Sequence, residues 1–132
     1  MKKQIKLLHS PRSEAQHQIN VINWTLIHMH EYPELEMLYH TPNGGKRNKV
    51  AAKRLKDMGT KPGVPDLCLP VPRGPYHGLY IEMKTEQGHT TKKQEYWGAN
   101  LQAQGYRWRV CHGWNAAVAE LEWYLNLGAF HG

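Results

Sequence analysis

Residues 63–84 restrict the fold of this 132-residue chain more than any other segment. Residues 63–69 and 79–84 are two short runs with apolar cores, and residues 70–78 between them are rich in proline and glycine. Apolar runs on either side of such a turn are typical of two antiparallel strands joined as a β-hairpin. We therefore expect a hairpin here, with the remaining elements packed around it.

The second strand of this hairpin combines an apolar face with a charged one. Residues two apart share a face of an extended chain, so Glu82 and Lys84 point one way while Ile81 and Met83 point the other. Strand pairing would bring Asp66 close to Glu82. Two carboxylates about 4 Å apart repel each other by roughly 4 kcal/mol at an effective dielectric of about 20, and Lys84 offsets only part of this. Converging oxygen ligands suit a hard divalent cation such as Mg²⁺, so these residues predict a metal site.

The sequence Gly-Val-Pro-Asp at residues 63–66, followed by Ile-Glu-Met-Lys at residues 81–84, resembles the core of the PD-(D/E)xK nucleases and, in particular, their compact VRR-NUC branch. An isolated Glu-x-Lys triplet is common on solvated strands, so the resemblance depends on the combination. It extends over about residues 14–125. It implies an α/β fold with a restriction-endonuclease-like core, in which a mixed central β-sheet is flanked by α-helices. We expect one domain over residues 1–132, with its core at about 13–127.

The resemblance also implies roles for individual residues. Asp66 and Glu82, with the backbone carbonyl of Met83, would hold Mg²⁺ or Mn²⁺, and Lys84 would orient or help deprotonate the attacking water. Nucleases of this superfamily often carry an acidic residue on the first helix, which points to Glu14 as a further ligand or as the ligand of a second ion. On its own, Glu14 is explained as well by its place at a helix start, where the helix dipole favours an acid.

Gln94 has two interpretations. Thr91 and Gln94 form a capping-box pattern, in which the glutamine side chain caps its own helix. Members of the VRR-NUC branch carry a glutamine at the matching place, which implies a catalytic position near Lys84. The sequence leaves both interpretations open.

Basic residues gather between residues 46 and 61, in a chain with a formal net charge of +6 and a pI of about 9.4. A glycine-containing turn precedes them, and glycines let the backbone approach a phosphate chain closely. This uneven charge suits a nucleic acid, although a solvated basic helix explains the segment alone equally well. The VRR-NUC proteins carry a similar loop. The candidate DNA-binding residues are Asn43, Gly44, Gly45, Lys46, Arg47, Lys49 and Lys53.

The other elements follow from apolar periodicity and from breaker residues. We expect a helix at 13–32, a strand at 35–39, a helix at about 49–58, a helix at about 91–104, a strand at 106–110 and a final helix from about 115. The first helix is expected to bury a stripe formed by Ala15, Ile19, Ile22, Leu26 and Met29. The helix at 49–58 is expected to bury Ala51, Leu55 and Met58.

The function implied by the resemblance is that of a metal-dependent DNA endonuclease acting as a homodimer on branched DNA such as Holliday junctions. Trp123 and Tyr124 supply aromatic surface either for the core or for such a dimer interface. Two other classes stay open. One is a non-catalytic nucleic-acid-binding module, in which Asp66, Glu82 and Lys84 form a structural ion cluster; the other is a small-molecule hydrolase.

Cysteine usage and the N-terminus bear on the compartment. Cys68 and Cys111 are too few for a disulfide framework and too far apart in sequence for a zinc-binding pair. The N-terminus lacks the apolar run of a signal peptide, and no segment reaches the roughly 20 apolar residues of a membrane span. We therefore expect a cytoplasmic location, no membrane partner and no small-molecule cofactor. The resemblance to compact VRR-NUC proteins implies a bacterial cell, with the gene belonging to the bacterium or to a phage.

Overall fold

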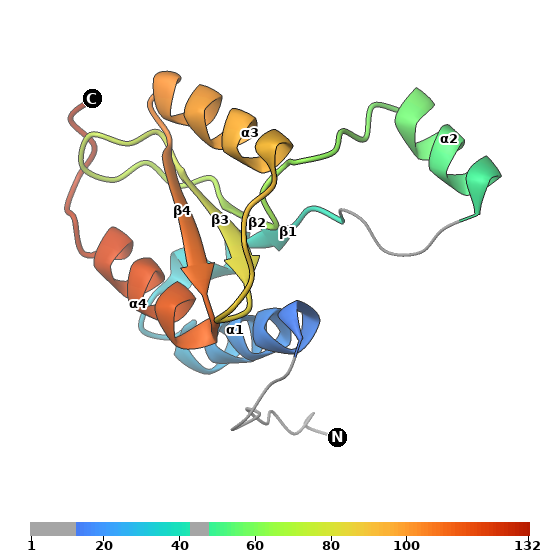
Figure 1. Cartoon of the computed structure of the whole chain (residues 1–132). Helices are drawn as coiled ribbons and strands as arrows, with labels where there is room; N and C mark the ends of the chain where they lie inside the picture. The colour runs from blue at the N-terminus through green and yellow to red at the C-terminus, as the bar shows by residue number, and fades with distance from the viewer. Residues whose placement is uncertain (1–12, 43–47) are drawn as a thin grey trace.

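The computed structural model describes residues 13–42 and 48–132, and its elements surround one mixed β-sheet (Figure 1). In chain order they are α1 (Glu14–His28), the 3₁₀ helix η1 (Pro33–Met37), β1 (Tyr39–His40), α2 (Lys49–Asp57), β2 (Leu67–Leu69), β3 (Leu79–Lys84), α3 (Lys92–Ala103), β4 (Arg107–His112) and α4 (Trp114–Leu125). The four-stranded sheet has the order β1-β2-β3-β4. Its first two pairings are antiparallel and the β3/β4 pairing is parallel, which confirms the expected α/β class. Within the described ranges, no helix is both long and apolar enough to cross a bilayer.

The expected hairpin is formed by β2 and β3. The two strands pair antiparallel with Leu67 opposite Ile81, so one further step along the ladder brings Asp66 towards β3. β2 begins only at Leu67 because Pro65 has no backbone donor and Gly63 adopts a positive φ of 90°. Asp66 therefore lies immediately before the first strand of the hairpin.

Helices α1 and α4 cover one face of the sheet, and α3 covers the other (Figure 1). On the α1/α4 face, alternate side chains of β3 enter the apolar core with residues that include Val21, Leu35, Leu67, Leu69, Ala117, Leu121 and Tyr124. On the opposite face, the ring of Tyr80 packs edge-on against Tyr106, 5.4 Å between centroids. Glu82 and Lys84 lie on this same face of β3, as the alternation predicts.

Gly98 lets α3 pack directly on β4. A Cβ atom at this position would overlap the indole ring of Trp108. We expect Gly98→Ala to lower the free energy of unfolding by about 1–3 kcal/mol, because this overlap outweighs the gain of about 1 kcal/mol in helix propensity. Chemical denaturation measures the change, and Gln102→Ala, an exposed site on the same helix, should stay within about 0.5 kcal/mol of wild type. Unchanged or greater stability of Gly98→Ala would contradict this close packing.

The predicted core stripe of α1 is wrong for most of its members, although Ile22 does pack against the core. Ile19 and Leu26, two of its members, are 53% and 46% exposed. The buried residues of the helix are instead His17, Asn20, Val21, Trp24 and Thr25. Polar members of this face have partners inside the protein: His17 Nδ1, for example, accepts the backbone N–H of Trp114 at 3.0 Å. A count of apolar residues misses such a face because it gives no weight to polar groups that are satisfied in the interior.

The region after α1 also differs from expectation. The helix ends at His28, ahead of the predicted end at residue 32. The predicted strand at 35–39 is wrong for most of its length, because η1 occupies residues 33–37. Pro33 suits the first turn of a helix and cannot donate to a strand ladder. The sheet therefore gains only the short strand β1 from this region.

Helix α2 begins at Lys49 as expected, and Asn48 caps it by accepting the N–H of Ala51 at 2.7 Å. It stands apart from the sheet (Figure 1) and buries none of its residues. The predicted burial of Ala51, Leu55 and Met58 is wrong, since Met58 is 73% exposed and the other two are only partly covered. The amphipathic pattern thus predicts the helix correctly and its packing incorrectly.

Candidate active site

A cleft with a volume of about 580 Å³ brings together all of the predicted catalytic residues. Glu14 comes from the start of α1, Asp66 from the residue before β2, Glu82 and Lys84 from β3, and Gln94 from the first turn of α3. These positions lie far apart in sequence, and the sheet with its two flanking helix starts is what unites them. Lys92 and Lys93 also line the cleft, and no sequence motif marks them.

Asp66 is fixed in place by the backbone of the neighbouring strand. Its Oδ2 atom accepts the N–H of Met83 at 2.7 Å, which ties the carboxylate to β3 immediately beside Glu82. A charge-assisted bond of this kind holds both the position and the orientation of the carboxylate. The expected approach of Asp66 to Glu82 through the pairing of the two hairpin strands is therefore present.

Glu82 is almost completely buried, with 2% of its surface exposed. Burial raises the pKa of its carboxyl to about 9; the neighbouring Asp66 acts in the same direction, Lys84 opposes it, and Glu14 adds to it. Among the described residues, no group hydrogen-bonds to Glu82 Oε1. A buried carboxyl oxygen without a donor is costly, so this atom is suited to a ligand that the cleft admits.

Lys84 lies between two carboxylates. Its Nζ atom is 3.9 Å from Glu82 Oε2 and 3.6 Å from Glu14 Oε1. Both distances exceed the roughly 2.7–2.9 Å of a direct charge-assisted hydrogen bond, so Lys84 acts here as a neighbouring charge and not as a bonded partner. The side chain of Glu14 is 52% exposed, whereas that of Lys84 is only 10% exposed. Glu14 therefore faces the open side of the cleft.

The donor set of the cleft fits a hard divalent cation. The described residues contain no preassembled group of three or more His, Cys, Asp or Glu side chains in a metal-binding arrangement. Mg²⁺ does not require one, because proteins usually hold it through one or two carboxylates together with water and substrate phosphates. Asp66 and the unpartnered Oε1 of Glu82 supply ligands of this type.

The VRR-NUC domain model matches residues 7–115 of the chain, most of its length. The chain belongs to the VRR-NUC family. A solved structure described as a VRR_NUC domain protein superposes with a TM-score of 0.80 and 30% identity, over 93% of this chain and 96% of that chain. A comparison with curated proteins finds no match. VRR-NUC domains are nuclease-type domains, so membership implies nuclease activity, a nucleic-acid substrate and, as in nuclease domains generally, divalent metals.

Gln94 of this VRR-NUC domain lies at the cleft wall and also caps its own helix. Its side-chain oxygen accepts the N–H of Thr91 at 2.9 Å, and the Thr91 hydroxyl accepts the N–H of Gln94 at 3.2 Å. Both halves of the predicted capping box are therefore present. The contacts of its side chain are those of a cap, and a catalytic part for Gln94 stays a prediction.

The predicted DNA-binding residues of the VRR-NUC chain divide into two groups. Residues 43–47, which include Asn43, Gly44, Gly45, Lys46 and Arg47, lie outside the described residues. Lys49 and Lys53 are exposed on α2, where Lys53 Nζ is 2.6 Å from Asp57 Oδ2. An exposed pair of this kind contributes little to stability, so Lys53 can exchange Asp57 for a phosphate group.

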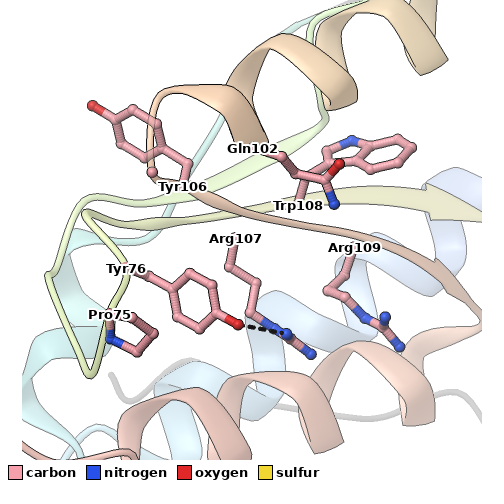
Figure 2. A pocket seen from close by; sticks show the side chains of 8 residues that line it. Pro75, Tyr76, Gln102, Tyr106, Arg107, Trp108 and Arg109 are labelled. Carbon is pink, nitrogen blue, oxygen red and sulfur yellow. Dashed lines mark hydrogen bonds between the residues drawn. The ribbon is translucent and has the colours of Figure 1, made fainter. Parts of the chain in front are cut away.

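The arginines of β4 face α4 rather than the cleft (Figure 2). Arg107 forms an ion pair with Glu120, and its Nη1 group donates a hydrogen bond to the Tyr76 hydroxyl oxygen at 3.2 Å. Its Cζ atom lies 4.1 Å from the ring centroid of Trp123. Arg107 is therefore engaged inside the domain. Tyr124 is completely buried and belongs to the core, whereas Trp123 is 45% exposed.

Proposed function

We propose that this VRR-NUC protein is a Mg²⁺- or Mn²⁺-dependent endonuclease that hydrolyses DNA phosphodiester bonds, with a preference for branched DNA such as Holliday junctions. One observation carries the proposal. The buried Oε1 of Glu82 has no hydrogen-bond partner among the described residues, and it lies in a cleft that also contains Asp66 and Lys84. A metal-binding nuclease site accounts for the cost of keeping that carboxyl buried.

Each residue of the cleft has a part in the proposed mechanism. Asp66 and Glu82, with the backbone carbonyl of Met83, would hold the cation, which when bound supplies Lewis-acid stabilisation of the phosphate. Lys84 would hold the attacking water in line with the phosphorus and offset negative charge on the phosphate. Glu14 faces the Nζ atom of Lys84 and would either orient Lys84 or supply a further metal ligand. Gln94 would contact the substrate from the start of α3.

Helix α2 would hold the DNA backbone beside this cleft. None of its residues is buried, it carries Lys49 and Lys53, and one acid lies at its end. Residues 43–47 belong to the proposed surface on sequence grounds. Binding of this kind depends on charge and not on base sequence, so it suits an enzyme that selects DNA by its structure.

Replacing Lys49 and Lys53 together with alanine should weaken DNA binding without impairing the chemistry. The slope of log K against log salt is negative, and each lost phosphate contact reduces its magnitude by about 0.9. The double variant should therefore show a slope that is smaller in magnitude by about 2. Fluorescence anisotropy in EDTA at several salt concentrations measures it. The cleavage rate at saturating DNA should match wild type. An unchanged salt slope would exclude α2 from the DNA-binding surface.

We further propose that the protein acts in the cytoplasm as a homodimer, because two-fold symmetry suits paired cuts in a four-way junction. The test of function uses purified wild-type protein on linear duplex, single-stranded, flap and four-way DNA, with Mg²⁺ or Mn²⁺, together with sedimentation analysis. We expect cleavage with either metal, fastest on branched substrates, by a dimer. Binding to DNA without cleavage under any of these conditions would favour a non-catalytic binding module instead.

A further inference from the structure

A second cavity adjoins the active-site cleft. Its volume is about 460 Å³, within the range of about 300–1,000 Å³ that is usual for small-ligand pockets. The two cavities share Val64 in their walls; Lys61 lines the second cavity, and Pro62 and Gly63 line the cleft. A DNA strand that enters the cleft therefore has this second cavity beside it.

Helix α3 fixes the spacing between the two cavities. Lys93 lines the cleft and Trp97 lines the second cavity, and residues four apart lie on one face of a helix, about 6 Å apart along its axis. A Cβ atom at Gly63 would lie 2.7 Å from the carbonyl oxygen of Lys93, so the segment between the cavities sits directly on the start of α3. The distance between Lys93 and Trp97 along the helix axis exceeds the ~3.4 Å rise between stacked nucleotides of one strand. This spacing suits a nucleotide that has left the stack.

The lining of the second cavity matches the chemistry of a nucleobase. Trp97 is only partly buried, and Pro42, Met58 and Val64 add apolar surface around it. Lys61 stands exposed at the rim, where it would meet a phosphate. Aromatic side chains beside basic residues are the usual means of binding unpaired nucleotides, and stacking contributes about 1–3 kcal/mol per base.

We propose that the Trp97 cavity binds an unpaired nucleobase of the DNA, next to the phosphodiester that the cleft cuts. The inference rests on the proposed nuclease function and explains part of its selectivity. A base inside a duplex has both faces covered by its neighbours and cannot stack on Trp97. Flaps and junctions offer unpaired or easily unpaired bases beside a duplex, so they fill the cavity where linear duplex does not.

The test uses flap DNA with 2-aminopurine at single unpaired positions beside the branch. Stacking quenches this base, so wild-type protein in EDTA should quench it at one or two positions. Trp97→Ala should abolish the quenching, and Trp97→Phe should retain most of it. Tyr96→Ala is the matched control, because Tyr96 is 70% exposed on the same helix and does not line the cavity.

Cleavage provides the second measurement. Single-turnover cleavage of the flap by Trp97→Ala should be slower than wild type by about 5- to 150-fold, the equivalent of one stacked base, while cleavage of linear duplex is unchanged. Should Trp97→Ala fail to fold, Trp97→Phe with an abasic nucleotide at the quenched position decides the same question. Equal quenching and equal cleavage ratios in wild type and Trp97→Ala would overturn the cavity assignment. Absence of cleavage by wild type on every substrate would instead overturn the nuclease function, and the quenching would then still report on the cavity.

Discussion

Replacing Glu82 with glutamine is expected to slow DNA cleavage by at least about 10³-fold, because a cation that stabilises the transition state by several kcal/mol loses a charged ligand. Glutamine keeps the shape of the side chain, so DNA binding measured in EDTA should stay within about twofold of wild type, as expected for a change worth less than about 0.5 kcal/mol. Single-turnover cleavage of a four-way junction in Mg²⁺ measures the loss. Glu122→Gln, an exposed carboxylate on α4, is the control and should leave the rate unchanged.

The same substitution should stabilise the metal-free protein. The pKa of Glu82 is raised from 4.5 to about 9, chiefly by burial, so the folded protein retains a proton that the unfolded chain releases. The stability that this group contributes is present below the unfolded pKa and is lost as pH rises towards the folded pKa. Glu82→Gln in EDTA should therefore melt at a higher temperature than wild type, by a margin that grows between pH 5 and pH 8. A margin that shrinks with rising pH, or wild-type cleavage by the variant, would contradict the assigned place of Glu82.

Replacing Lys84 with methionine is expected to slow cleavage at saturating DNA by about 10²- to 10³-fold, the range seen when one preorganised electrostatic donor is removed. Lys84 is 8% exposed, and its Nζ atom is the cation that faces Glu82 and Glu14 in the cleft. Methionine fills a similar volume without the charge. Because the substitution affects the chemical step and not the affinity for DNA, the rate constant at saturating DNA should fall while the DNA-binding constant in EDTA stays close to wild type.

Lys84→Arg separates charge from position at this site. Arginine preserves the charge, but its planar guanidinium is larger than an ammonium group and cannot occupy the same point between the two carboxylates. We expect it to recover only a small part of the lost rate. A Lys84→Met protein that cleaves at the wild-type rate, with its fold confirmed by thermal melting, would show that Lys84 only balances charge in the cleft.

The cleft was largely predictable from the sequence, because local patterns place Asp66, Glu82 and Lys84, and the resemblance to the VRR-NUC family points to Glu14 and Gln94. Turn residues on either side of short apolar runs specify the hairpin, and the period of two specifies which side of β3 carries Glu82 and Lys84. The capping pattern at Thr91 specifies where α3 begins and hence where Gln94 lies. These signals act over a few residues, and the sheet register then brings them together.

The features that the sequence does not predict correctly depend on contacts between segments that are distant along the chain. The buried face of α1 includes His17, whose acceptor atom is satisfied by Trp114, nearly a hundred positions away along the chain, and no periodicity in α1 reports that contact. The pattern of α2 predicts an apolar stripe, but whether a stripe is covered depends on where the connecting segments carry the helix. The Trp97 cavity also forms from separate segments, around Pro42, Met58 and Lys61, so only the folded chain reveals it.

The most direct test of the active site is the metal dependence of cleavage by the wild-type protein. The protein is stripped of metal with EDTA, and cleavage of a four-way junction is followed as Mg²⁺ or Mn²⁺ is added back. We predict no cleavage in EDTA, saturable recovery with either ion, and no recovery in Glu82→Gln at the same concentrations. Full activity in EDTA, or equal recovery in Glu82→Gln, would contradict a catalytic metal site at Asp66 and Glu82.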